Sequence, residues 1–195
     1  NYPKPFLYAL MNLMGSHDRP RILNVLAGND GSDIPRDQRA HHRLSPEERM
    51  IGALREQLML RFIFSVPGMP CIYYGDEAGM EGCADPFCRR PYPWGHEDAQ
   101  MLARYQAMTA MRNAHPVLRT GECIYLAPCA DVLGVIRKNE SGRDAFGSQA
   151  ENACAVTLIN RSAKEVVVYL TAEDVCGAKT LVTDDGQTLS ARGGA

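Results

Sequence analysis

The sequence predicts two kinds of structure in one chain: part of an α/β barrel, followed by a small antiparallel β-sandwich. Three observations predict this fold class. Apolar residues follow a helical spacing up to about residue 120, one compact apolar strand opens into a long polar loop, and short strand-like runs fill the rest. We therefore expect two domains, 1–119 and 120–195.

The first two elements are expected to be short helices. An amphipathic stretch over 5–14 carries large apolar residues at helical spacing. A second helix is expected over 19–27, with Gly28 at its end and Asp18 placed to cap its exposed amide groups. Residues 29–43 are polar and contain Gly, Asp and Arg, which indicates a long surface loop.

A longer helix is predicted to begin after Ser45. Ser45 and Glu48 have the spacing of a capping box, and Pro46 stands in the first turn, where its missing N–H costs nothing. The last turns are apolar almost all round, as in a helix buried between layers. Pro67 and Gly68 are expected to end it.

A strand, a loop and another helix are expected next. The apolar run 70–74 suits a strand that is buried on both faces. Residues 75–95 form a polar loop rich in Gly and Pro, and a helix follows over 98–113, closed by Pro116. A buried strand that opens into a loop of carboxylates, arginines and one Trp is typical of the active face of an α/β barrel.

After residue 120 the apolar pattern is that of strands. Turn-rich separators divide six short candidates, which predicts a small β-sandwich. The candidates are 123–126, 132–138, 154–160, 166–170, 179–182 and 187–189.

Composition excludes several classes of protein. The 195 residues include 21 Lys+Arg and 23 Asp+Glu, and 45% are apolar, which argues against intrinsic disorder. With a net charge of -2, the chain has no excess of basic residues that would attract nucleic acid or an anionic membrane. No apolar run approaches the about 20 residues that span a bilayer. Because the sequence begins Asn-Tyr-Pro without Met, we expect a processed chain or a piece of a longer protein.

The seven cysteines are scattered, and no C-x-x-C pair occurs. Most lie in or beside apolar runs, where a free Cys behaves as a small hydrophobe. We therefore expect reduced thiols and a cytoplasmic protein, with a Cys83–Cys88 bridge or a metal as the alternative interpretation. Otherwise we expect neither a cofactor nor a metal, because the sequence has no Asp/Asn-rich loop or zinc-type spacing that would require one.

Two segments carry the candidate chemistry. The first, 12–21, is Asn-Leu-Met-Gly-Ser-His-Asp-Arg-Pro-Arg, and the second runs over 67–94 and ends in Arg-Arg-Pro-Tyr-Pro-Trp. Taken alone, Asp18 would be a helix cap, His17 a surface histidine, and the second segment a salt-bridged loop. In a cleft, the same Arg and Asp side chains can hold sugar hydroxyls, and an aromatic ring can stack on a pyranose.

Together the two segments resemble glycoside hydrolase family 13, the α-amylase family, and within it the cyclomaltodextrinase, neopullulanase and maltogenic amylase group. Residues 12–18 are similar to the motif that ends the seventh strand of that barrel. The run Pro-Gly-Met-Pro-Cys-Ile-Tyr-Tyr-Gly-Asp-Glu at 67–77 is similar to the eighth strand, and 85–94 to the loop after it. Order and spacing agree over most of 1–185. The resemblance implies the C-terminal part of a (β/α)8 TIM barrel, with strands seven and eight, followed by an antiparallel β-sandwich.

The resemblance also implies roles for four residues. Asp18 would be the catalytic carboxylate that stabilises the transition state, with His17 in contact with the bound glucosyl ring. Asp85 and Arg89 would bind substrate hydroxyls just beyond the cleavage point. The role of Asp18 is physically sound, because glycosidic cleavage builds positive charge on the ring and a fixed carboxylate in a water-poor cleft stabilises it.

The activity implied is that of a retaining α-glucan hydrolase that cleaves α-glucosidic bonds in maltodextrins, cyclodextrins or pullulan. Such an enzyme needs a nucleophile and a general acid about 5–5.5 Å apart. In this family they lie on the fourth and fifth strands, whose motifs nothing in the sequence matches. We therefore expect the chain to be inactive alone, and either to be held by the missing N-terminal part of the same protein or to self-associate. The alternatives are a glucanotransferase or α-glucosidase on the same scaffold, and a non-catalytic sugar-binding or interaction subunit.

Overall fold

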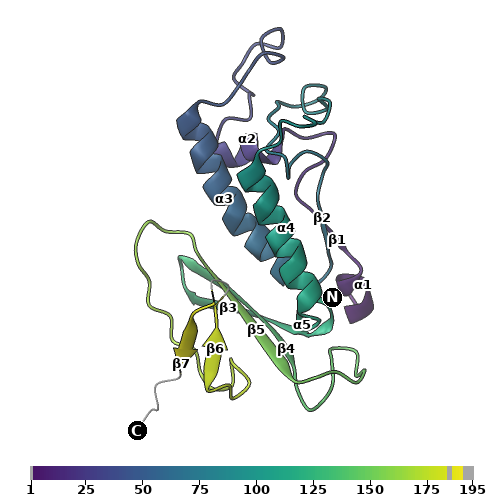
Figure 1. Ribbon diagram of the computed structural model, residues 1–195, viewed down its shortest axis with the longest axis vertical. Coiled ribbons are helices and arrows are strands. Elements are labelled where there is room, and N and C mark those ends of the chain that lie inside the picture. The colour runs from purple at the N-terminus through teal and green to yellow at the C-terminus, as the bar shows by residue number, and fades with distance from the viewer. Residues whose placement is uncertain (1, 184–185, 191–195) are drawn as a thin grey trace. The chain divides into compact units, whose positions relative to one another are not determined.

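The computed structural model describes residues 2–183 and 186–190, and the chain divides into two compact units, Asn1–Arg119 and Thr120–Ala195. The first unit mixes helices with a short parallel sheet, and the second is built from antiparallel strands (Figure 1). The helices are α1 (Lys4–Tyr8), α2 (Ile22–Ala27), α3 (Pro46–Ser65), α4 (Ala99–Ala114) and α5 (Val117–Thr120). The strands are β1 (Met11–Leu13), β2 (Met69–Cys71), β3 (Glu122–Cys129), β4 (Val132–Asn139), β5 (Ala153–Asn160), β6 (Thr180–Val182) and β7 (Thr188–Ser190).

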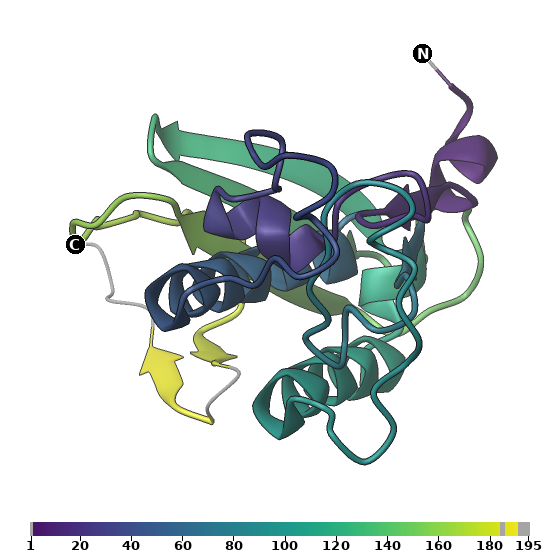
Figure 2. The same ribbon diagram turned by 90° about the horizontal axis from the view of Figure 1, so that it is seen from above.

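The core of the first unit lies along α3, which packs against α2 and α4 (Figure 2). Leu60 and Phe64 are four residues apart on α3, so they share one face, and both are buried. They form one apolar cluster with Leu23 of α2 and with Met101 and Tyr105 of α4. Burial of this face, and not helix propensity alone, stabilises the three helices as a unit.

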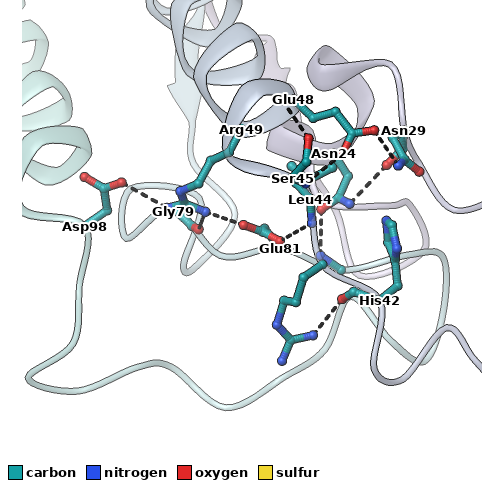
Figure 3. Close-up of polar contacts among 12 residues, drawn as sticks. Asn24, Asn29, His42, Leu44, Ser45, Glu48, Arg49, Gly79, Glu81 and Asp98 are labelled. Carbon is teal, nitrogen blue, oxygen red and sulfur yellow. Dashed lines mark hydrogen bonds and ion pairs between the residues drawn. The ribbon is translucent and has the colours of Figure 1, made fainter.

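The predicted capping box of α3 is confirmed (Figure 3). The Glu48 amide donates to Ser45 Oγ at 3.2 Å, and the Ser45 amide donates to Glu48 Oε2 at 2.7 Å. Asn29 Nδ2 donates to Glu48 Oε1 at 2.8 Å, so the same carboxylate also fastens the loop before the helix. At the other end α3 stops at Ser65, two residues before Pro67, as the sequence predicted.

Arg49 links the start of α3 to the start of α4 (Figure 3). Its guanidinium contacts Glu81 Oε1 at 2.5 Å and Asp98 Oδ2 at 2.9 Å, and it donates to the Gly79 carbonyl at 3.1 Å. Asp98 also caps α4, because Oδ1 accepts from the Met101 amide at 3.0 Å. One carboxylate therefore both begins a helix and holds two helices together.

We expect Asp98→Ala to lower the free energy of unfolding by about 1–2 kcal/mol, since the change removes a helix cap and one partner of a half-buried guanidinium. Ser45→Ala, which removes only a cap, is the matched comparison and should cost less. Urea denaturation of both variants measures the difference. Equal losses would show that the Arg49 contact adds nothing to the cap.

The core also contains a buried carboxyl group. Glu56 of α3 is fully buried, and Tyr105 Oη donates to its Oε1 at 2.5 Å. Its second oxygen, Oε2, has no hydrogen-bond partner within the described residues. Burial raises the pKa of Glu56 to about 7, and the hydrogen bond from Tyr105 offsets only part of that effect.

Glu56→Gln is expected to flatten the pH dependence of stability. The folded-state pKa of Glu56, about 7, lies above its ordinary value of 4.5, so the folded protein holds a proton that the unfolded chain has lost between these values. The free energy of unfolding therefore falls as pH rises through this window, by up to about 3 kcal/mol from this residue. Glutamine keeps the acceptor for Tyr105 without the charge, so the variant should be the more stable protein at about pH 8.

Urea denaturation across this pH range measures the effect, with Glu47→Gln on the exposed first turn of α3 as the control. Part of the pH dependence of the free energy of unfolding remains in both variants, because burial also raises the pKa of Asp76 to about 6. A Glu56→Gln protein that is less stable than the wild type at about pH 8 would contradict the prediction.

The start of the chain differs from the predicted helix over 5–14. Only Lys4–Tyr8 is helical, and Met11–Leu13 is a strand that pairs in parallel with β2. The Met69 amide donates to the Leu10 carbonyl at 2.7 Å, and Asn12 Nδ2 donates to the Pro67 carbonyl at 2.9 Å. These bonds to a distant segment outweigh the local helical spacing.

Two further expectations for the first unit are wrong. The strand predicted over 70–74 is only Met69–Cys71, and it is not buried on both faces, since Met69 is 53% exposed. The second helix begins at Ile22, after Pro20, and its N-cap residue is Arg21, so Asp18 does not cap it. The end predicted at Gly28 is confirmed, because this glycine takes the left-handed backbone conformation (φ 81°) that ends helices.

The second unit contains a three-stranded antiparallel sheet in the order β3-β4-β5 and a hairpin of β6 and β7. The central strand β4 buries Val135 and Ile136 on opposite faces, and its Arg137 is buried with Nη2 donating to the Gly121 carbonyl at 2.9 Å. Five of the six predicted strands are confirmed, with β3 extended to Cys129. The remaining candidate, 166–170, is not a strand; Val167 and Tyr169 are exposed there, and a run of apolar residues without a pairing partner does not make a strand.

Candidate active site

The parallel pairing of β1 and β2 brings the two motif segments together. Met11 pairs with Met69 and Leu13 with Cys71, so both strands end at the same edge. The first segment continues from that edge to His17 and Asp18, and the second into the loop 75–95. This edge is where an α/β barrel carries its chemistry.

All four predicted site residues meet there. His17 Nε2 lies 3.1 Å from Asp18 Oδ1, and Arg89 Nη2 lies 3.8 Å from the same oxygen. Arg89 Nε contacts Asp85 Oδ1 at 2.6 Å and the His17 carbonyl at 3.1 Å. Residues separated by about 70 positions thus form one cluster of two carboxylates, one guanidinium and one imidazole.

The cluster is open to solvent. The exposed fractions of the side chains are 62% for His17, 68% for Asp18, 48% for Asp85 and 45% for Arg89. In water an ion pair at such distances contributes about 1 kcal/mol or less. The described residues therefore hold the four side chains in place without forming the water-poor cleft in which a carboxylate acts most strongly.

Arg21 holds the loop that carries Asp85 and Arg89. It is 1% exposed, and its Nε donates to the Cys88 carbonyl at 2.7 Å. Its Nη1 donates to the Tyr74 carbonyl and contacts Asp76 Oδ1 at 3.1 Å. The guanidinium also lies over the Tyr73 ring, 4.4 Å from its centroid. One side chain thus fixes the end of the second strand and the loop that presents Arg89.

The start of α2 is hydrogen-bonded to the same loop. The Arg21 amide donates to the Gly82 carbonyl at 2.9 Å, and the Gly82 amide donates to Asn24 Oδ1 at 2.8 Å. Cys88 Sγ donates to the His17 carbonyl at 3.1 Å. Sequence reasoning missed this role of Arg21; its only signal was an arginine directly before an apolar helical run.

Asp76 is the buried partner of Arg21. Burial raises the pKa of its carboxyl to about 6, although the hydrogen bond and charge of Arg21 oppose the rise. Gly15 leaves room for it, because a Cβ at this position would collide with Asp76 Oδ2. Nearby, the Gly75 amide donates to Glu77 Oε2 at 2.8 Å. These contacts indicate a structural role for Asp76 and Glu77 at the end of the strand segment.

Other features of the described residues limit the chemistry. A cavity of about 620 Å³ lies between the end of β2 and α4, but none of the four clustered residues lines it. Within residues 2–183 and 186–190, no three His, Cys, Asp or Glu side chains converge as metal ligands. All seven cysteines are unbridged, so the alternative Cys83–Cys88 bridge is wrong. In the same residues, no helix is long and apolar enough to cross a bilayer.

Several curated proteins are similar in sequence to most of this chain. An amylopullulanase from Thermoanaerobacter thermohydrosulfuricus is 35% identical over 96% of this chain and 13% of its own length. A cyclomaltodextrinase from Geobacillus thermopakistaniensis is 30% identical over 83% of this chain and 22% of its own length. The chain thus spans less than a quarter of these relatives. No protein-family profile matches the chain.

Solved structures give the same result. A maltogenic amylase from S. marinus superposes with a TM-score of 0.60 at 25% identity, over 92% of this chain and 20% of that one. A cyclic α-maltosyl-(1→6)-maltose hydrolase from Arthrobacter globiformis, in complex with maltose, superposes with a TM-score of 0.55 at 28% identity, over 73% of this chain and 27% of that one.

These similarities relate the chain to the glycoside hydrolases. More narrowly, these relatives and solved structures cover most of this chain and are consistent with a C-terminal part of a cyclomaltodextrinase-like member of glycoside hydrolase family 13, which confirms the resemblance seen in the sequence.

Proposed function

We propose that this chain is the C-terminal portion of a retaining α-glucan hydrolase that cleaves α-glucosidic bonds in maltodextrins, cyclodextrins or pullulan. In this proposal the unit Asn1–Arg119 supplies strands seven and eight of a (β/α)8 barrel, and Thr120–Ala195 is the C-terminal β-sandwich. The observation that carries the proposal is the meeting of Asp18, His17, Asp85 and Arg89 at the ends of two parallel strands.

Each clustered residue has a proposed role. Asp18 stabilises the positive charge that develops on the glucosyl ring, and His17 donates to hydroxyls of that ring. Asp85 and Arg89 bind hydroxyls of the sugar beyond the scissile bond. The contacts of Arg89 with Asp18 and with Asp85 support this assignment, since they hold both carboxylates on one side of the loop.

Hydrolysis requires residues that this chain does not supply. A retaining mechanism uses a nucleophilic carboxylate and a general acid about 5–5.5 Å apart, and no pair of carboxylates in the cluster matches those roles in the family. The chain alone is therefore proposed to be inactive. The exposure of Asp18 agrees with this view, because its electrostatic effect grows only when the rest of a cleft excludes water.

The short sheet also needs a covering partner. Met11, Leu13, Met69 and Ile72 are apolar and exposed on or beside β1 and β2. We propose that the N-terminal part of the same protein covers them, or that the isolated chain self-associates there. Light scattering of the purified chain is expected to show self-association, and a monodisperse monomer would contradict it. A reducing, cytoplasmic location is proposed from the seven unbridged cysteines.

Sequencing the coding DNA upstream of Asn1 tests the function directly. We expect an in-frame barrel with a Gly-x-Arg-x-Asp strand end and a downstream catalytic Glu. The encoded protein should release sugars from cyclodextrin or pullulan with retention of the anomeric configuration, which NMR detects. Longer oligosaccharides as the main products would indicate a glucanotransferase. A barrel without those two carboxylates would leave a sugar-binding or interaction protein.

A further inference from the structure

Two thiols of the second unit lie against each other, beside the turn 171–177. Cys154 is the second residue of β5, and Cys176 belongs to the turn. Each thiol is near enough to shift the pKa of the other, and Cys154 Sγ donates to the Asp174 carbonyl at 3.6 Å, within the turn that carries Cys176. Two cysteines far apart in the sequence are therefore placed side by side by the fold of this unit.

The turn holds Cys176 in a defined position. Asp174 Oδ2 accepts from the Thr171 amide at 2.7 Å and from its hydroxyl at 2.8 Å, and the Gly177 amide donates to the Ala172 carbonyl at 2.7 Å. Cys176 has φ 54°, a left-handed conformation that side chains other than Gly rarely adopt. Such a backbone persists only where its surroundings fix it, so the turn holds the backbone of Cys176 in one conformation.

A charged pair stands next to the thiols. Lys138 of β4 is the cross-strand neighbour of Cys154, and its Nζ lies 3.0 Å from Glu140 Oε2. The Cys176 thiol lies near enough to the Glu140 carboxylate for each to shift the pKa of the other. The Glu140 carboxylate raises the pKa of the Cys176 thiol, whereas the Lys138 ammonium opposes that rise and stabilises the thiolate once it has formed.

We propose that Cys154 and Cys176 form a dithiol modification site that reacts with a small-molecule disulfide such as oxidised glutathione and closes into an intramolecular disulfide. The Cys176 thiolate attacks one sulfur of the reagent, which forms a mixed disulfide and releases one glutathione thiolate. The Cys154 thiolate then attacks the Cys176 sulfur and releases the second. The two cysteines lose two electrons and two protons in total, and one disulfide is reduced to two glutathione thiols.

The surroundings of the pair set the rate of this reaction. Burial raises the pKa of both thiols, that of Cys154 to about 12. Contact with Cys176 raises the pKa of Cys154 further, whereas contact with Cys154 lowers the pKa of Cys176. Lys138, Glu140, Glu173 and Asp174 are the charged groups beside them. Since only the thiolate reacts, closure should be slow near neutral pH and should accelerate by about tenfold per pH unit below the thiol pKa.

The test uses the full chain. Dilute protein is incubated with oxidised glutathione at about pH 7.5 and about pH 8.5, quenched with a thiol-alkylating reagent and analysed by mass spectrometry and peptide mapping. We expect one linked pair of peptides that contain Cys154 and Cys176, distinct from the single mixed disulfides that glutathione forms with exposed thiols such as Cys129. Closure should be about tenfold faster at the higher pH.

Variants identify the reacting pair. Cys154→Ala should retain glutathione on Cys176 and form no internal disulfide, whereas Cys129→Ala, which removes an exposed thiol of the same unit, should close like the wild type. The wild-type map decides the question even where a variant does not fold. Continued alkylation of both Cys154 and Cys176, or a disulfide between other cysteines, overturns the proposal.

Discussion

Asp18→Asn, made in the complete protein that contains this chain, is expected to lower kcat by about 10²-fold or more while KM changes by less than about threefold. Asparagine keeps the size of the side chain but loses the negative charge. The lost interaction is stronger in the transition state than in the bound substrate, because positive charge develops on the sugar only during cleavage. Turnover should therefore fall much more than substrate affinity does.

Steady-state kinetics on a cyclodextrin or pullulan measures this split, and Asp33→Asn in the exposed loop before α3 is the control with the same chemical change. The neutral amide also weakens the contacts that Asp18 Oδ1 makes with His17 Nε2 and Arg89 Nη2. A variant with unchanged kcat, or with a raised KM alone, would assign Asp18 to substrate binding instead of transition-state stabilisation.

Arg21→Met is expected to lower the free energy of unfolding by about 3–5 kcal/mol at about pH 8, because it leaves the buried Asp76 carboxylate without its cation. It also removes the hydrogen bonds from the guanidinium to the Tyr74 and Cys88 carbonyls. The loss should be smaller at about pH 5, where Asp76 can take up a proton and become neutral.

Urea denaturation at both pH values measures these losses, with Arg19→Met as a control at an exposed position two residues earlier. The double variant Arg21→Met with Asp76→Asn should recover part of the stability lost at about pH 8, since it removes the unpaired charge. A single variant that is as stable as the wild type at about pH 8 would show that Arg21 does not hold the loop.

Local features of the fold could be predicted because their causes are local. The capping box at Ser45 and Glu48 and the helix end at Gly28 each depend on residues within a few positions of one another, and the strands of the β3-β4-β5 sheet pair with their neighbours in chain order. Such features need few contacts with distant parts of the chain, so the sequence pattern is sufficient to predict them.

The errors arose where distant contacts compete with local preference. Residues 11–13 have helical spacing but form a strand, because β2 supplies a parallel partner for their backbone. Asp18 has the position of a helix cap, yet it faces His17 and Arg89 while Arg21 takes the cap position. Residues 166–170 have the composition of a strand but pair with no neighbour.

The candidate site shows the same division. From the sequence alone, the resemblance of the two motif segments to glycoside hydrolase family 13 singled out His17, Asp18, Asp85 and Arg89. Only the tertiary structure decided how they are held, through the buried guanidinium of Arg21, which joins the strand end to the loop across more than 50 positions. A buried charge is tolerated only where its partners are already assembled around it, and those partners come together only when the chain folds.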